Sequence, residues 1–321
     1  MTSNSSNLES APNIVALAGG VGGAKLAHGL AQIHPPEKLT VVVNTADDFE
    51  HLGLHISPDL DTVMYTLAGL ANPETGWGQV DETWQVMEAL GRLGGPTWFN
   101  LGDRDLATHL LRSHWLREGY PLSWVTGQLC RRFGVKPTLL PMSDDPVRTR
   151  LQTDQGPLEF QDYFVRRRWQ PVVQAIEFEG SQTAQPLRQV VDAIRWADLI
   201  VFCPSNPLVS IDPILAVPGL RRLIAASRAA KVAVSPIVGG RALKGPAAKM
   251  MAELGLPVSP VGVARHLREL LTAFVLDEQD AGDKLTIAYD LGLRALVTDT
   301  VMKDDRDRAR LAGEVVEFAI T

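Results

Sequence analysis

The stretch Ile14-Val-Ala-Leu-Ala-Gly-Gly-Val-Gly-Gly-Ala-Lys25 decides the fold of this 321-residue chain. Its first five residues are apolar, which is typical of a parallel strand that is covered on both faces. Glycines then follow at positions 19, 20, 22 and 23, where the backbone can turn sharply and approach a ligand. We expect a helix to begin near Ala24, so that backbone N–H groups and the positive end of the helix dipole meet at one point. This order predicts a phosphate site, with Lys25 as a nearby cation.

The glycine spacing has a simpler interpretation as well. It matches neither the dinucleotide fingerprint Gly-x-Gly-x-x-Gly nor the Walker pattern, so the motif by itself is weak. A glycine turn can also serve only to bring a strand and a helix close together.

Further buried strands end in polar loops along the chain. Leu39 to Asn44 reads as a second strand, joined to the first by a helical crossover, and it runs into Thr45-Ala-Asp-Asp48. Later strands run into Pro204-Ser-Asn-Pro207 and into the loop from Pro236 to Lys244. Open α/β sheets bind ligands at the carboxyl ends of their strands. The pattern predicts an α/β, Rossmann-like fold of three layers with a mostly parallel sheet.

The chain divides into three parts by composition and by the pattern of apolar residues. Residues 1–12 are rich in Ser and Asn, and we interpret them as a disordered tail. Residues 13–60 and 135–321 carry the strand pattern and form the expected nucleotide-binding core. Residues 61–134 show helical periodicity with one short strand expected at Thr97 to Phe99, and we expect a helical insertion that forms part of the acceptor site. Tryptophans are concentrated in it, at positions 77, 84, 98, 115 and 124.

Composition excludes several classes of protein. A formal net charge of -6 argues against a general nucleic-acid binder. The two cysteines form neither a disulfide framework nor a metal motif, so a reducing, cytoplasmic location is expected. No stretch has the roughly 18 consecutive apolar residues of a membrane span, and no signal peptide is indicated.

Carboxylates in the loops indicate a divalent cation. Asp47 and Asp48 follow the second strand, and Asp59 and Asp61 open a helix. Carboxylates opposite glycine amides suit Mg²⁺, which bridges carboxylate and phosphate oxygens. Alternatively, Asp59 or Asp61 serves only as a helix cap or a first-turn acid. The predicted ligand is a nucleotide or a diphosphate.

Other polar residues have structural interpretations. Arg104 in Gly-Asp-Arg-Asp105 is either a salt-bridged surface residue or a cation that points into the cleft. The run Arg166 to Arg168 reads as a solvated surface, and Cys203 reads as a small core residue. The 7 histidines show no metal-ligand spacing. No covalent nucleophile is predicted, and phosphoryl transfer needs none.

Seven motifs together resemble a known family. They occur in the order seen in the 2-phospho-L-lactate transferase family of deazaflavin coenzyme biosynthesis, and they cover nearly all of the chain beyond Pro12. The motifs are Gly19-Gly-Val-Gly-Gly-Ala-Lys25, Asn44-Thr-Ala-Asp-Asp48, Ser57-Pro-Asp-Leu-Asp-Thr-Val-Met-Tyr65, Gly102-Asp-Arg-Asp105, Pro141-Met-Ser-Asp144, Pro204-Ser-Asn-Pro207 and Ser235-Pro-Ile-Val-Gly239.

The resemblance implies a reaction. A guanosine diphosphate ester of 2-phospho-L-lactate, or of phosphoenolpyruvate, transfers its phospho-acid to the ribityl hydroxyl of 7,8-didemethyl-8-hydroxy-5-deazariboflavin (Fo), and GMP leaves. The product belongs to the biosynthesis of coenzyme factor 420, and the expected partners are these small molecules, with a homodimer as the expected assembly. Which phospho-acid is carried stays open at this point.

The resemblance also implies site residues. Asp61 and Arg104 fall at positions of the Fo site. Asp48 and Asp61 are expected to hold Mg²⁺ and to act in catalysis, although Asp61 could instead be the base for the hydroxyl. The donor site is expected to comprise Gly19, Gly20, Gly22, Gly23, Lys25, Ser205, Asn206, Gly239 and Gly240. Many relatives carry two threonines in the glycine loop that this chain lacks, which leaves only backbone contacts to phosphate there.

Two other functions are weighed against the transferase. A related family shares the glycine-rich start and binds nucleotide sugars as a regulator of carbon metabolism, but the motifs around Asp61 and Arg104 favour the transferase. An NAD-binding oxidoreductase lacks its glycine fingerprint here.

Overall fold

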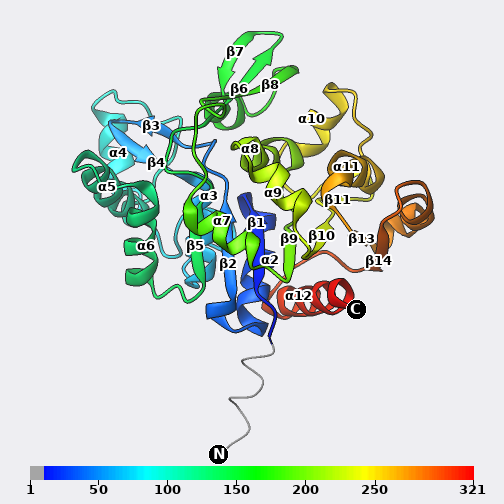
Figure 1. The fold of residues 1–321 in the computed structure, drawn as a ribbon. Coiled ribbons are helices and arrows are strands. Elements are labelled where there is room, and N and C mark those ends of the chain that lie inside the picture. Colours follow the sequence, from blue (N-terminus) through cyan, green and yellow to red (C-terminus); the bar gives the residue numbers. More distant parts are fainter. Residues whose placement is uncertain (1–10) are drawn as a thin grey trace, which may run out of the picture.

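The computed structural model describes residues 11–321 and centres on a sheet of seven parallel strands (Figure 1). The predicted tail, residues 1–12, lies almost wholly outside the described residues. In spatial order the sheet comprises β14 (Arg294–Thr298), β13 (Ala273–Asp277), β10 (Ala230–Val234), β9 (Leu199–Phe202), β1 (Ile14–Ala18), β2 (Leu39–Val43) and β5 (Thr138–Pro141). The order reverses between β1 and β9. This confirms the predicted α/β fold.

Helices cover both faces of this sheet. Successive strand residues point to opposite sides, so each strand contributes side chains to two cores. Ile14, Ala16 and Ala18 of β1 enter one core and Val15 and Leu17 enter the other. The first core is closed by α2 (Gly20–Ile33), α3 (Pro58–Leu67), α6 (Leu122–Phe133) and α12 (Asp305–Ile320). The second is closed by α7 (Arg188–Arg195), α8 (Asp212–Ala216), α9 (Leu220–Ala226), α10 (Ala247–Glu253) and α11 (Pro260–Leu267). The sheet is thus the middle of three layers.

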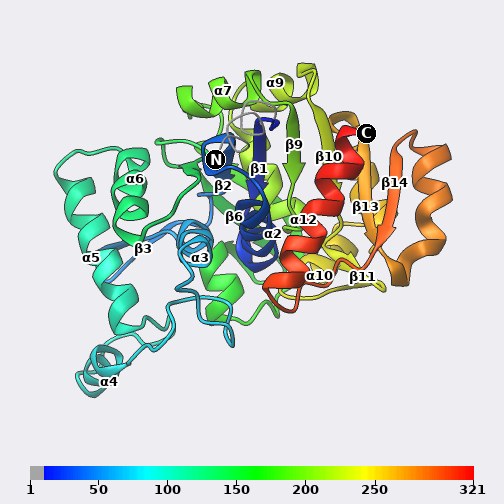
Figure 2. The ribbon, with the colours of Figure 1, turned by 90° about the horizontal axis from the view of Figure 1, so that it is seen from below.

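The stretch between β2 and β5 supplies most of the irregular structure. A hairpin of β3 (Phe49–His51) and β4 (Leu54–Ile56) precedes α3, and α4 (Gln85–Arg92) and α5 (Asp103–Arg117) precede α6. Figure 2 shows α4 and α5 at one end of the molecule and β14 at the opposite end. The limits of the helical insertion stay a prediction, and α3 packs closely on α2 of the core.

The short strand expected at Thr97 to Phe99 is wrong. That segment is irregular, and its aromatic rings pack against the β3–β4 hairpin instead of pairing in a sheet. The ring of Phe99 lies 4.8 Å from that of Phe49, and the ring of Trp98 lies 5.2 Å from that of His51. Burial of aromatic side chains therefore accounts for the apolar character of the segment.

A second, antiparallel sheet stands at the top of Figure 1. It consists of β6 (Arg148–Thr153), β7 (Gly156–Glu159) and β8 (Val173–Glu179). The sequence predicts β7 and β8. β6 was not expected, because the stretch is polar and therefore shows no apolar alternation, although its residues do alternate between buried and half-exposed positions. A two-residue pair, β11 (Ile237–Val238) and β12 (Arg241–Ala242), closes the loop after β10.

Within residues 11–321, no helix combines the length and the apolar composition that crossing a membrane requires.

The packing of α2 on α12 gives a test of the fold. A Cβ atom at Gly29 would lie 2.1 Å from the Arg308 carbonyl oxygen, so Gly29→Ala must push the helices apart. We expect a loss of about 1–3 kcal/mol in the free energy of unfolding, measured by urea denaturation. Gly313→Ala, in open space on α12, is the matched control and should stabilise by about 0.5–1 kcal/mol. Equal effects of the two changes would contradict the close approach.

Candidate active site

The glycine segment forms the first turn of α2. The helix begins at Gly20 rather than near Ala24, so the prediction of a separate loop before it is wrong. Glycine is a poor helix former, which is why the sequence placed the start later. Contacts with other loops fix this turn: the Gly19 N–H donates to Ser205 Oγ at 3.1 Å, and the Gly20 N–H donates to Asp59 Oδ1 at 2.8 Å.

The glycines let two loops meet at the point where the strand order reverses. A Cβ atom at Gly22 would lie 2.2 Å from the Pro204 carbonyl oxygen, and one at Gly23 would lie 2.4 Å from Ser205 Oγ. The turn after β1 therefore touches the turn after β9. Open α/β sheets bind ligands in the crevice at such a switch point.

A cavity of about 800 Å³ lies at this point. It has the size of a site for a small organic ligand. Its wall includes the first turn of α2, the turn after β9, parts of the helical insertion, the segment 242–247 and the segment 300–303.

The structure separates the predicted site residues into two groups. Those that line the cavity are Gly19, Gly20, Gly22, Lys25, Asp61, Ser205 and Asn206. Those that do not are Gly23, Asp48, Arg104, Gly239 and Gly240. Arg104 is exposed and donates to the Val80 carbonyl oxygen at 2.9 Å, and the Gly239 N–H donates to Asp280 Oδ2. Ligand roles stay predictions for both groups.

Two carboxylates lie in the cavity wall beside the start of α2. Asp47 and Asp59 are both buried, and Asn44 Nδ2 donates to Asp59 Oδ2 at 3.0 Å. Burial raises the pKa of Asp59 to about 6. Burial, together with the nearby charge of Asp59, raises the pKa of Asp47 well above its ordinary value. Two buried acids that disfavour each other's ionisation suit a divalent cation, which would remove that repulsion.

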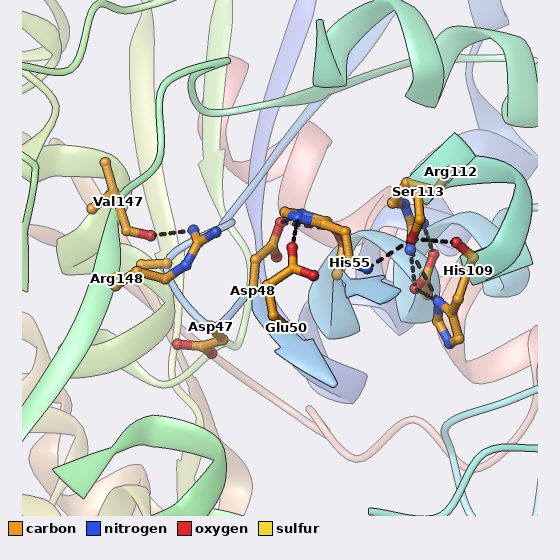
Figure 3. Close-up of polar contacts among 12 residues, drawn as sticks. Asp47, Asp48, Glu50, His55, His109, Arg112, Ser113, Val147 and Arg148 are labelled. Atoms are coloured by element: carbon orange, nitrogen blue, oxygen red, sulfur yellow. Dashed lines mark hydrogen bonds and ion pairs between the residues drawn. The ribbon is translucent and has the colours of Figure 1, made fainter. Parts of the chain in front are cut away.

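Asp48 faces a smaller neighbouring cavity of about 230 Å³. Its Oδ2 accepts from Ser57 Oγ at 2.8 Å and lies 3.1 Å from His55 Nε2. In Figure 3 the His55 ring lies between Asp48 and Glu50, while Arg148 lies on the other side of Asp48. Asp48 thus holds the hairpin that precedes α3, and Asp47 rather than Asp48 reaches the larger cavity.

A buried polar network joins α3 to α5. Arg112 is 1% exposed and donates hydrogen bonds to both carboxylate oxygens of Asp61. Its Nη1 lies 3.0 Å from Oδ2, and its Nη2 contacts Oδ1. Arg112 Nη1 also lies 3.2 Å from His109 Nδ1. His109 Nε2 lies 3.3 Å from Asp105 Oδ1, and the Tyr65 hydroxyl donates to the same oxygen at 2.7 Å. Figure 3 shows His109 and Arg112 side by side on α5.

The ionisation of this network follows from burial and pairing. Burial raises the pKa of Asp61, and the charge of Arg112 opposes that rise. Burial is the largest influence on Asp105 and acts to raise its pKa, but the contacts with His109, Tyr65 and Arg112 together outweigh burial and lower the pKa of Asp105. Asp61, Asp105 and His109 each offer one ligand atom, and these atoms lie within 4.8 Å of one another. This group is therefore a second possible metal site.

Sequence reasoning missed His109, Asp105 and Arg112. Asp105 and Arg112 are assigned no role in the sequence analysis, and the histidines are set aside there because they lack metal-ligand spacing. A usable signal was present: positions 105, 109 and 112 share one face of a helix, as do Asp61 and Tyr65 four residues apart on α3. Two polar faces at helical spacing predict a pairing between helices.

Cations gather at the end of the cavity nearest to α2. Lys25 Nζ donates to the Met302 carbonyl oxygen at 2.6 Å, and Lys244 Nζ donates to the Thr75 carbonyl oxygen at 3.1 Å. Burial lowers the pKa of Lys25, and the charges of Arg308 and Lys244 lower it further. Ammonium groups that repel one another beside a helix N-terminus favour an anion.

Aromatic rings line another part of the wall. Trp98 and Phe99 come from the helical stretch and pack against the β3–β4 hairpin, whereas Trp77, from the same stretch, follows the segment that contacts Lys244 and Val21. Phe160 and Phe164 come from the segment that follows β7, and their rings are stacked with centroids 5.5 Å apart. The cavity therefore combines an anion-binding end with an apolar, aromatic end.

Comparison with known proteins identifies the family. The model of the family described as 2-phospho-L-lactate transferase CofD matches residues 14–317. The chain belongs to this family. It is accordingly a CofD-type transferase of the biosynthesis of coenzyme F420.

Individual relatives agree with this assignment over nearly the whole chain. The chain is 46% identical to a phosphoenolpyruvate transferase of Streptomyces griseus subsp. griseus, which it covers to 98% with 95% of its own length. It is 42% identical to a 2-phospho-L-lactate transferase of Methanosarcina acetivorans, with 94% of this chain and 98% of that protein covered. The crystal structure of protein BH3568 from Bacillus halodurans matches with a TM-score of 0.66, 16% identity and coverage of 96% of this chain and 100% of that one, which supports the fold.

The contact between the first turn of α2 and the turn after β9 gives a second test. Gly22→Ala would place a methyl group against the Pro204 carbonyl oxygen and displace the backbone N–H groups that face the cavity. We expect GDP affinity, measured by calorimetry, to fall at least tenfold in the CofD-type transferase. Gly53→Ala, in open space on the β3–β4 hairpin, is the control and should leave GDP affinity unchanged. Unchanged GDP binding in a folded Gly22→Ala variant would show that these glycines serve packing alone.

Proposed function

We propose that the cavity binds a guanosine diphosphate ester of a phospho-acid and Fo side by side. The observation that carries this proposal is one continuous cavity whose lining includes the start of α2 and two lysines as well as several aromatic rings. A diphosphate suits the helix start and the lysines, and a flat deazaflavin suits the aromatic rings. Transfer between two substrates requires that both meet in one site.

The donor occupies the end at the β1–β9 switch point. The N-terminal turn of α2 offers backbone N–H groups, and Ser205 and Asn206 lie across from it in the turn after β9. Lys25 and Lys244 supply positive charge for the phosphate and carboxylate groups of the donor. Gly239 and Gly240 do not line the cavity. They remain candidates for binding the nucleoside part only because other residues of the loop that follows β10 line it.

Asp47 and Asp59 would hold Mg²⁺ at the donor site. Both side chains are buried in the cavity wall beside α2, and the pKa of each is raised in the absence of a cation. Asp48 faces the smaller cavity, and Asp61 is already neutralised by Arg112, so the two metal ligands expected from the sequence are less well placed. When bound, Mg²⁺ would neutralise charge on the transferring phosphoryl group.

The acceptor occupies the aromatic end. Asp61 lies in the wall there and can accept a hydrogen bond from the ribityl hydroxyl. The hydroxyl oxygen forms a bond to the phosphorus nearer the acid, and the bond from that phosphorus to the bridging oxygen breaks. GMP leaves with the bridging oxygen, and the hydroxyl proton passes to Asp61. Aromatic walls around this end exclude water, which would otherwise hydrolyse the donor.

We propose phosphoenolpyruvate as the phospho-acid. Five relatives named phosphoenolpyruvate transferase are 42% to 46% identical to this chain, compared with 39% to 42% for three named 2-phospho-L-lactate transferase. The purified protein with Fo and an equimolar mixture of both guanylyl donors tests the choice by mass spectrometry of the products. The phosphoenolpyruvyl product should dominate, and a dominant phospholactyl product would reverse the assignment.

Removal of the metal should abolish transfer. We expect GMP release in the presence of Fo and donor to stop in excess chelator and to return with Mg²⁺, because the two buried acids would otherwise repel the donor phosphates. Asp47→Asn should lower kcat at least a hundredfold, whereas Asp290→Asn, at an exposed position remote from the lining, should leave it unchanged. Full turnover in chelator would exclude the metal from the reaction.

The two residues expected at the Fo site should differ in importance. Asp61 lines the cavity, whereas Arg104 is exposed and bound to a backbone carbonyl group. Asp61→Asn should therefore weaken Fo binding, measured by the fluorescence of Fo, more than Arg104→Ala does. GDP affinity should change in neither variant. A larger effect of Arg104→Ala on Fo would place the acceptor closer to the start of α5 than proposed.

A further inference from the structure

We infer that Arg112 is a positioning residue for the transfer reaction, and that it acts by holding the Asp61 carboxylate in one orientation toward Fo. The inference rests on the proposed acceptor role of Asp61. Arg112 itself is absent from the cavity lining and is 1% exposed, so it does not touch substrate.

The geometry fixes both rotation and position of the carboxylate. The two guanidinium nitrogens of Arg112 meet the two oxygens of Asp61 in a fork, which allows a single orientation of the carboxylate plane. Each carboxylate oxygen has a second lone pair, so the fork leaves Asp61 able to accept from a ligand in the cavity. A lysine at position 112 would keep the charge but lose the fork.

The guanidinium group of Arg112 also contacts His109, through the same nitrogen that donates to Asp61. Arg112 Nη1 lies 3.2 Å from His109 Nδ1, and His109 Nε2 lies 3.3 Å from Asp105 Oδ1, which accepts from the Tyr65 hydroxyl. Arg112, His109 and Asp105 lie on α5, and Tyr65 lies on α3. The chain of contacts ties the orientation of Asp61 to the packing of the two helices.

Stability alone does not account for this arrangement. A buried ion pair adds little net stability compared with apolar side chains of the same volume, because both charges are taken out of water. An apolar pair, however, could not present a carboxylate to the cavity. The arrangement therefore matches a requirement for orientation, in which a small misplacement costs much of the rate.

A double-mutant cycle tests the inference. We expect Arg112→Lys to lower kcat at least tenfold and to weaken Fo binding, with GDP affinity unchanged within twofold. In an Asp61→Asn background, Arg112→Lys should lower kcat less than twofold further, because Arg112 acts only through Asp61. Arg132→Lys on α6, where Arg132 contacts Gln128 and the Trp115 ring and does not line the cavity, is the matched control with unchanged kcat. Independent, additive losses would overturn the positioning role.

Two further outcomes distinguish a failure of the proposed acceptor site from a failure of the positioning role. If Asp61→Asn leaves Fo binding and kcat intact, the proposed acceptor site is wrong. If Asp61→Asn is inactive but a folded Arg112→Lys is fully active, the acceptor site stands and only the positioning role is wrong. Should Arg112→Lys not melt cooperatively, the crystal structure of the wild-type complex with Fo decides. It must show Asp61 in contact with Fo while both bonds to Arg112 persist, and an Asp61 turned away from Arg112 would overturn the inference.

Discussion

The close approach of two backbone turns at the β1–β9 switch point is the constraint on which the site depends. Side chains at Gly22 or Gly23 would occupy the space of the Pro204 carbonyl group or the Ser205 hydroxyl group. Because that space is free, α2 begins directly beside the turn after β9. Its N-terminal N–H groups are thereby placed at the carboxyl edge of the sheet, where the acids that follow β2 also lie.

The second constraint is the polar contact between α3 and α5. Charged side chains are seldom fully buried unless they are paired, and here Arg112 pairs with Asp61 while His109 lies against both Arg112 and Asp105. The network thus joins α5 to α3, which packs on α2 of the core, and three of its side chains, Asp61, Asp105 and His109, also line the cavity. Binding at the acceptor end and packing of the insertion are consequently linked.

The sequence allowed the sheet to be predicted because its strands are short apolar runs that end in turn residues. Periodicity reports burial within one element, so β1, β2 and β9 were recognisable. The polar strand β6 and the early start of α2 were not, because tertiary contacts rather than local preference fix them.

The candidate site was predictable in part. The glycines, Lys25, Asp61, Ser205 and Asn206 were found because polar residues at strand ends converge on one edge. Asp47 was weighed as one of a pair, but only the fold shows that it reaches the large cavity while Asp48 faces the small one. Arg112 and His109 contact Asp61 across 51 and 48 residues of chain; helical spacing indicates a polar face on each helix, but it does not specify which side chains of the two faces meet.

The most direct test of the account is the crystal structure of the protein with GDP, Mg²⁺ and Fo bound together. The account predicts the diphosphate at the backbone N–H groups of the first turn of α2, the metal on Asp47 and Asp59, and the ribityl end of Fo between the diphosphate and Asp61. A diphosphate bound away from α2, or Fo outside the aromatic end of the cavity, would contradict it.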